Sequence, residues 1–278
     1  VPLNKQKAMA SAGNSANSAG EPKPPPANFG DHWYQGQAEI TSYHLQQARY
    51  GEIHEGSAVA IFVTEDHHPE THIKLDNPQS AKEKVNVLKL NLTKKFTTGI
   101  YPYSMMLSVF NPVRVEQHGH AHRVTCSSQE WCGQTFTAIN KEGSGYHYQL
   151  FSYFESEGIV DKQLEQAWLE DELWTQLRIN PDNLPTGEFE IVEGAFYQRL
   201  AHTAVEVRSA QGQLIKQPDR NLAEYTIYYP HNERSLTITF ENSFPYAIAG
   251  WEETYTDGGE RLVTRATKKE TIMAAYWG

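Results

Sequence analysis

Apolar and polar side chains alternate with a period of two residues along much of this sequence. Leu88, Leu90 and Leu92 alternate with Lys, Asn and Thr, and the same pattern occurs at residues 34–41, 225–229 and 236–240. Successive side chains of a β-strand point to opposite faces of its sheet, so a period of two predicts strands with one buried face. The pattern recurs from one end of the chain to the other, and this favours a mainly β protein.

Turn-forming sequences separate these stretches. They lie at residues 141–145, 210–213, 230–233 and 257–260 and are rich in Gly, Asn and Asp. Connections this short join antiparallel neighbours, whereas parallel neighbours need a crossover of about a dozen or more residues. We therefore expect an antiparallel curved sheet or a half-barrel meander.

One segment, residues 161–179, has a different pattern. Helix-forming residues run through it, and Leu169, Leu173 and Leu177 follow one another at four-residue spacing. Asp161 is a candidate N-cap, and Pro181 follows the end of the segment. A helix in a β protein must bury its apolar face, so we expect this helix to pack on the concave side of the sheet.

The chain length of 278 residues is compatible with one all-β domain preceded by a tail, because such domains often reach about 200–250 residues. Residues 1–29 contain Ser, Asn, Gly and Pro with few apolar residues, and such a segment cannot offset the entropy lost on ordering. We expect a disordered tether at 1–29 and a single domain at 30–278. The tether suits a protein held away from a membrane anchor, although a terminus without function has the same composition.

The sequence begins at Val1 and not at a methionine, which indicates that a signal peptide or an expression tag has been removed. A lipid anchor, if there is one, would lie upstream of Val1.

No stretch reaches the roughly 18 apolar residues of a membrane-spanning helix, and the mean hydropathy is -0.61. Acidic residues outnumber basic ones by 34 to 24, and this net charge of -10 repels nucleic acid.

The two cysteines, Cys126 and Cys132, are six residues apart. In one continuous strand they would be separated by about 20 Å, whereas a disulfide requires Cα atoms within about 7 Å. A bridge therefore needs a tight reversal at residues 127–129. The alternative is a pair of free thiols, which in most proteins are small buried apolar groups.

Histidines form two groups. His118, His120 and His122 would share one face of an extended strand and could bind zinc or copper there, but they also suit a solvated loop. The other group, His67, His68 and His72, lies beside Pro69 and is more typical of a turn. We expect no cofactor and no physiological metal.

Two carboxylates stand next to tryptophans, Glu130 before Trp131 and Glu252 after Trp251. An indole against a carboxyl group raises its pKa toward that of a general acid. Neighbours in a strand point to opposite faces, however, so each glutamate could simply lie on the solvent side. Glycine-rich phosphate loops, nucleophile elbows and zinc-protease helices are absent from the sequence.

Several motifs resemble a family of bacterial envelope proteins, many of them predicted lipoproteins. The motifs are Trp33-Tyr34-Gln35-Gly36, Gly99-Ile100-Tyr101-Pro102-Tyr103, Glu130-Trp131-Cys132-Gly133, Gly250-Trp251-Glu252-Glu253 and Ala275-Tyr276-Trp277. Some members carry the label of Maf septum-formation inhibitors, but the Ser-Pro-Arg-Arg signature of Maf nucleotide hydrolases is absent here. The order of elements is also distantly similar to the half-barrels of periplasmic lipoprotein carriers, in which a curved sheet wraps a helix.

The resemblance implies a protein of the periplasm or outer membrane, either anchored or secreted. We expect it to be non-catalytic and to bind a lipid, another apolar ligand or an envelope protein on its curved sheet. Its aromatic content of 12% suits such a surface, although aromatic residues are enriched in any β core. The alternative is a hydrolase that uses Glu130, Glu252 and a histidine.

Overall fold

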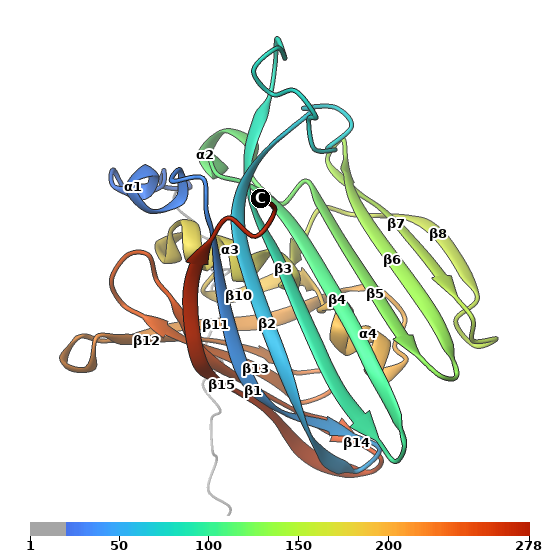
Figure 1. Ribbon diagram of the computed structural model, residues 1–278. Coiled ribbons are helices and arrows are strands. Elements are labelled where there is room, and N and C mark those ends of the chain that lie inside the picture. Colours follow the sequence, from blue (N-terminus) through green and yellow to red (C-terminus); the bar gives the residue numbers. More distant parts are fainter. Residues whose placement is uncertain (1–20) are drawn as a thin grey trace, which may run out of the picture.

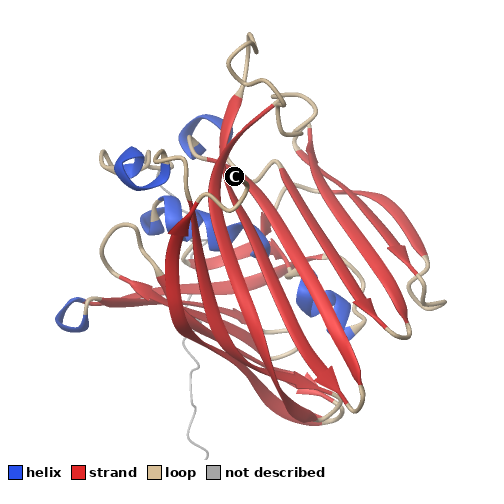
Figure 2. Cartoon of the chain, viewed as in Figure 1, coloured by secondary structure: helices blue, strands red, loops and turns tan. Residues whose placement is uncertain are grey.

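The computed structural model describes residues 21–278, so most of the predicted tether lies outside the described residues. The described chain forms one open, curved sheet of 15 strands, which confirms the predicted fold class (Figures 1 and 2). Most of the regular structure consists of strands, as Figure 2 shows. The strands are β1 (Ala38–Arg49), β2 (Glu52–His67), β3 (Val85–Thr98), β4 (Tyr101–Pro112), β5 (Arg123–Glu130), β6 (Gly133–Glu142), β7 (Gly145–Ser152), β8 (Ile159–Leu164), β9 (Trp168–Leu169), β10 (Gly187–Val192), β11 (Val207–Gln217), β12 (Leu222–Tyr229), β13 (Arg234–Glu241), β14 (Ile248–Asp257) and β15 (Glu260–Ala274).

Strands that follow one another in sequence are neighbours in the sheet. The order is β8-β7-β6-β5-β4-β3-β2-β1-β15-β14-β13-β12-β11-β10-β9, so the first and last strands pair in the middle. All pairs are antiparallel except the short β9–β10 pair. The chain crosses from the edge strand β8 to the edge strand β9 between Leu164 and Trp168. Four residue steps span at most about 14 Å, so strong curvature must bring these strand ends close together.

The helices are short. They are α1 (Phe29–Trp33), α2 (Val115–His118), α3 (Glu170–Ile179) and α4 (Ala195–Ala201), with 3₁₀ turns η1 (Pro181–Asn183) and η2 (Pro218–Arg220). Figure 1 shows α3 and α4 between the strands β1–β8 and the strands β10–β13 behind them. All ten residues of α3 are buried, and Leu173 and Leu177 are fully inaccessible. The predicted packing of a helix on the concave side is confirmed.

The predicted start of that helix at residue 161 is wrong. Residues 159–164 form the edge strand β8, where exposed and half-buried residues alternate. Asp161 does not cap a helix but accepts hydrogen bonds from His147 and Gln149 of β7. The helix begins after Leu169, whose backbone N–H donates to Glu172 Oε1 over 3.0 Å. Pairing with β7 outweighs the modest helix propensity of this stretch.

Two other boundaries differ from the sequence prediction. The first strand begins at Ala38 and not at Tyr34, because α1 and a turn with Gly36 at φ +67° precede it. The sequence at 210–213 is not a turn but part of β11. There, a Cβ on Gly212 would lie 2.3 Å from the Pro185 carbonyl oxygen, so this glycine permits a close backbone contact. The turns at 141–145, 230–233 and 257–260 are confirmed as hairpin connections.

The part of the predicted tether that is described makes specific contacts with η1. Lys23 N–H donates to Asn183 Oδ1, and Asn183 Nδ2 donates back to the Lys23 carbonyl, both over 2.8 Å. Asn180 Nδ2 donates to the Pro24 carbonyl over 3.0 Å. These contacts attach residues 23 and 24 to η1 and to Asn180 before it. Among the helices that the structure describes, none has the length and apolar character needed to cross a bilayer.

Candidate ligand pocket

The concave interior contains charged side chains as well as apolar ones. Lys94, Arg234 and Glu253 each occupy a strand position whose neighbours two residues away belong to the core. Alternation therefore directs these charges inward. Buried charges are stable only when they are paired or hydrogen-bonded, so the partners of each one define a polar layer inside the sheet.

Arg234 is the centre of this polar layer. Its guanidinium bonds both carboxylate oxygens of Glu170 at 2.6 and 2.7 Å, and Glu253 Oε1 at 2.6 and 2.9 Å. Tyr229 also donates its hydroxyl hydrogen to Glu170. Burial alone would raise the pKa of Glu170, but the charge of Arg234 lowers it below its usual value. The cluster thus joins the start of α3 to β13 and β14.

A small cavity of about 20 Å³ adjoins this cluster. It borders Lys94, whose ammonium lies 5.0 Å from the centre of the Phe196 ring. Burial lowers the pKa of Lys94. Burial and then the charge of Glu170 raise the pKa of the nearby Asp171 to about 7. This cavity has room for about one water molecule and not for an organic ligand.

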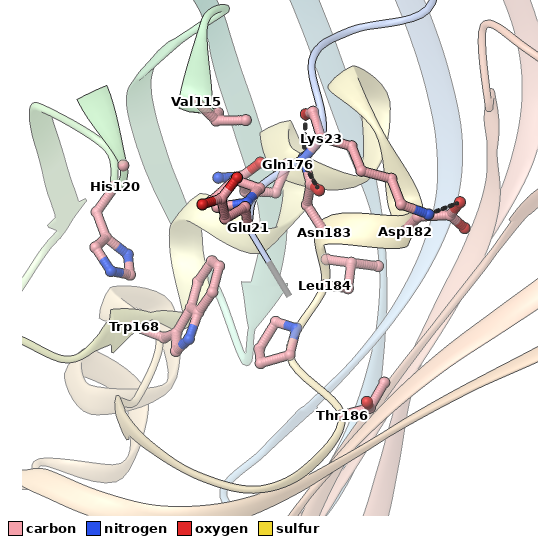
Figure 3. A pocket seen from close by; sticks show the side chains of 13 residues that line it. Glu21, Lys23, Val115, His120, Trp168, Gln176, Asp182, Asn183, Leu184 and Thr186 are labelled. Atoms are coloured by element: carbon pink, nitrogen blue, oxygen red, sulfur yellow. Dashed lines mark hydrogen bonds and ion pairs between the residues drawn. The ribbon is translucent and has the colours of Figure 1, made fainter. Parts of the chain in front are cut away.

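A larger pocket of about 350 Å³ lies beside α3 (Figure 3). Its walls come from the connection between α2 and β5, from β9, from α3, from residues 182–186 and from the segment 21–23. In Figure 3, His120 and Trp168 lie on one side of the pocket and Asn183 on the other, with Gln176 between them, whereas the Lys23 side chain extends away to Asp182. Small-molecule sites typically measure about 300–1,000 Å³, so this volume suits a small ligand.

His120 lines one wall of the pocket and is held there by its contact with the buried Glu172. Its Nδ1 lies 2.8 Å from Glu172 Oε1, and Ala121 N–H donates to the other oxygen of the same carboxylate. Its ring also packs edge-to-face on Trp168, with centroids 4.6 Å apart. Burial would lower the pKa of His120, but the charge and hydrogen bond of Glu172 raise it. Glu172 therefore compensates the charge of His120 when the imidazole is protonated.

Gln176 is the unpaired polar group of the pocket. Its residue is 2% exposed, and its buried Oε1 has no hydrogen-bond partner in the described structure. A buried acceptor without a partner costs about 1–3 kcal/mol of stability. Trp168 and Leu184 add apolar surface beside this amide. The pocket thus combines an aromatic wall with polar side chains, among them His120, Asn183 and Gln176.

The three alternating histidines do not share a strand face. His118 ends α2, and Gly119 at φ +74° turns the chain. His120 then faces Glu172, whereas the ring of His122 contacts those of His72 and His118, at 4.4 and 5.5 Å between centroids. In residues 21–278, no three His, Cys, Asp or Glu side chains are placed to hold a metal. The metal site considered at His118, His120 and His122 is therefore not formed.

His122 gives the protein a pH-dependent stability. Burial, followed by the charges of His72 and Lys141, lowers the pKa of His122 to about 3. The unfolded state, with a pKa of about 6.5, binds the proton first, so stability falls as the pH drops below about 6.5. Between pH 7 and pH 5 we expect His122→Phe to lose about 1–2 kcal/mol less than the wild type, measured by urea unfolding. Identical losses in the two proteins would contradict this origin.

Both cysteines are free. Cys126 is buried in β5 and Cys132 is exposed in the turn that follows. The reversal that a bridge would require at residues 127–129 does not occur, because these residues continue β5 to Glu130. Cys132 lies beside Glu130, whose hydrogen bond and charge raise the pKa of the thiol and leave it less reactive.

The glutamates next to tryptophans lie in different environments. Glu252 is exposed on β14 and pairs with Arg265, and its neighbour Trp251 is buried. Glu130 is buried, accepts from Cys132 N–H and lies 3.7 Å from Arg199, whereas Trp131 is exposed. One carboxylate is on the surface and the other is buried beside an arginine, so the two do not have the common setting that the alternative of a hydrolase requires.

Sequence reasoning missed the residues that form the pocket. His120 was considered only as a metal ligand, and Trp168 lay within the predicted helix at residues 161–179 without a role in a site. The sequence did contain a signal for the polar layer. Arg234 precedes Leu236 and Ile238 at two-residue spacing in an alternating stretch, so its side chain is expected on the same, buried face. The pairing of His120 with Glu172 had no such signal, since 52 residues separate them.

Comparisons with protein-family models, with curated proteins and with solved structures found no match. The resemblance to bacterial envelope proteins therefore stays a prediction.

Proposed function

We propose that this protein is a non-catalytic binding protein of the bacterial envelope, with its ligand site in the pocket beside α3. The observation that carries the proposal is a cavity of about 350 Å³ walled by Trp168 and lined by Gln176, whose buried amide oxygen has no partner among the described residues. A protein that gains nothing from an unpaired buried amide would be more stable with an apolar residue there. The resemblance to envelope proteins supports the location.

The packing of α3 favours a small ligand over a whole lipid. All ten residues of the helix are buried, so α3 fills the part of the concave side on which it packs. At about 30 Å³ for each water-sized group, the pocket accommodates about a dozen non-hydrogen atoms. We expect a neutral ligand, because Glu172 balances a charge on His120, Asp182 balances Lys23, and the remaining charged residue of the lining, Glu21, is exposed.

Benzamide is a suitable probe, because its flat ring suits Trp168 and its amide can pair with Gln176. We expect binding in the millimolar range, measured by ligand-detected NMR, and at least about tenfold weaker binding to Trp168→Ala. Trp131→Ala is the matched control, since Trp131 is exposed and does not line the pocket. Equal loss in both variants, or no binding to the wild type, would count against the proposal.

Gln176→Leu separates a ligand role from a structural one. We expect this variant to be more stable than the wild type by about 1 kcal/mol in thermal unfolding. Leucine is similar in size to glutamine but has no buried acceptor that lacks a partner. We also expect its affinity for benzamide to fall. A loss of stability would show instead that the amide supports the fold, and the proposal would lose its main argument.

A further inference from the structure

Four alternate strand connections each place a large apolar side chain on the surface at the same end of the sheet. They follow β1, β3, β5 and β7, and an up-and-down meander brings alternate connections to one end (Figure 1). The exposed fractions are 52% for Tyr50, 82% for Ile100, 68% for Trp131 and 75% for Tyr153. We call these four residues the apolar tips.

Neighbouring aromatic side chains connect the tips into a nearly continuous rim. The Tyr50 hydroxyl lies 2.8 Å from that of Tyr103, whose ring lies 5.8 Å from that of Tyr101. Tyr101 in turn stacks on Trp131 with centroids 6.1 Å apart. Beyond Trp131, the ring of Tyr153 packs directly over Gly133, where a Cβ would lie 2.6 Å from it. Contacts within the rim thus hold its exposed rings in place.

The rim carries little charge. The two middle tips, at residues 97–101 and 131–134, have no charged residue. The outer tips have one exposed carboxylate each, Glu52 and Glu155. The connections of the other half of the sheet, at residues 230–233 and 257–260, are polar and expose Glu233 and Glu260. The apolar character is therefore confined to one half of this end.

We propose that the apolar tips insert into the interface of an uncharged lipid bilayer. Tyrosine and tryptophan favour this layer, where an apolar ring and a polar group are both accommodated. The four side chains project from separate turns, so a protein partner would need a matching hollow for each, whereas a fluid bilayer needs none. Attraction to anionic lipid is not the driving force, because the tips lack exposed lysine and arginine. This contact is distinct from the pocket and does not depend on its ligand.

The test is sedimentation of the protein, produced as residues 1–278 without a lipid group, with phosphatidylcholine vesicles. We expect the wild type to bind and the double variant Ile100→Ser, Trp131→Ser to bind at least about tenfold more weakly. Ile73→Ser is the matched control, because Ile73 is 56% exposed in the connection between β2 and β3 at the opposite end. High salt should leave binding unchanged. Binding that salt abolishes, or that the double variant retains, overturns the proposal.

A second measurement tests directly whether Trp131 enters the bilayer. Vesicles with brominated acyl chains should quench part of the tryptophan fluorescence of the wild type, and Trp131→Phe should remove that quenching. Absence of quenching in sedimenting protein overturns the proposal. So does a wild-type dimer in solution that becomes monomeric in the double variant, because it would show that the tips contact a second copy of the chain.

Discussion

Arg234→Met is expected to lower the free energy of unfolding by about 3–5 kcal/mol, the usual cost of removing one partner of a buried ion pair. Arg234 is 1% exposed and neutralises both Glu170 and Glu253, which are themselves buried. Without it, two carboxylates must either stay charged without a partner or take up protons on folding. Urea unfolding at pH 7 measures the loss.

Arg265→Met is the matched control for this change. Arg265 makes a similar bond to Glu252 over 2.6 Å, but both side chains are about half exposed. Exposed pairs contribute about 0–1 kcal/mol, so this variant should unfold close to the wild-type midpoint. Adding Glu170→Gln and Glu253→Gln to Arg234→Met should recover part of the loss, because it removes the uncompensated charges. Equal midpoints for Arg234→Met and Arg265→Met would show that the inner cluster is not a charged one.

Leu173→Ala is the second large effect that we expect, at about 2–5 kcal/mol. Leu173 lies in the middle of α3 and is fully buried against the sheet. Its truncation removes apolar contact and leaves a cavity that the surrounding strands can fill only partly. The shift of the unfolding midpoint in urea measures this cost.

Ile73→Ala is the control for the truncation, because Ile73 is 56% exposed and its replacement should cost a few tenths of a kcal/mol. The comparison also bears on function. If Leu173→Ala unfolds like the wild type, α3 can leave the concave side, and the space beneath it becomes available to a lipid. A large loss supports a filled interior and the smaller pocket at its side.

The sequence by itself determined the architecture of most strands. In the stretches around Leu90, Ile227 and Ile238, a period of two specified both the strand and its buried face, because the backbone alternates side chains regardless of their partners. The same rule applies to Arg234, whose position in the alternation marks it as an inward charge. Short turns then specified antiparallel neighbours, because a connection of a few residues is too short to return the chain to the start of a parallel neighbouring strand.

Only the tertiary structure decided where the helix begins and what surrounds it. Residues 161–164 have helix-forming side chains, but the free edge of β7 offered them a ladder of hydrogen bonds, and that gain exceeded a preference of a few tenths of a kcal/mol per residue. The helix α3 begins only after Leu169, because the chain first crosses to the opposite edge of the sheet and pairs there as β9.

The pocket also depended on contacts between distant parts of the chain. His120 meets Glu172 across 52 residues, and Lys23 meets Asn183 across 160. A pattern of local periodicity contains no information about such pairs, because it fixes the face on which a side chain lies but not the residue that it meets. The curvature of the sheet supplies that information, since it brings the α2–β5 connection, β9 and the start of the domain to the same side of α3.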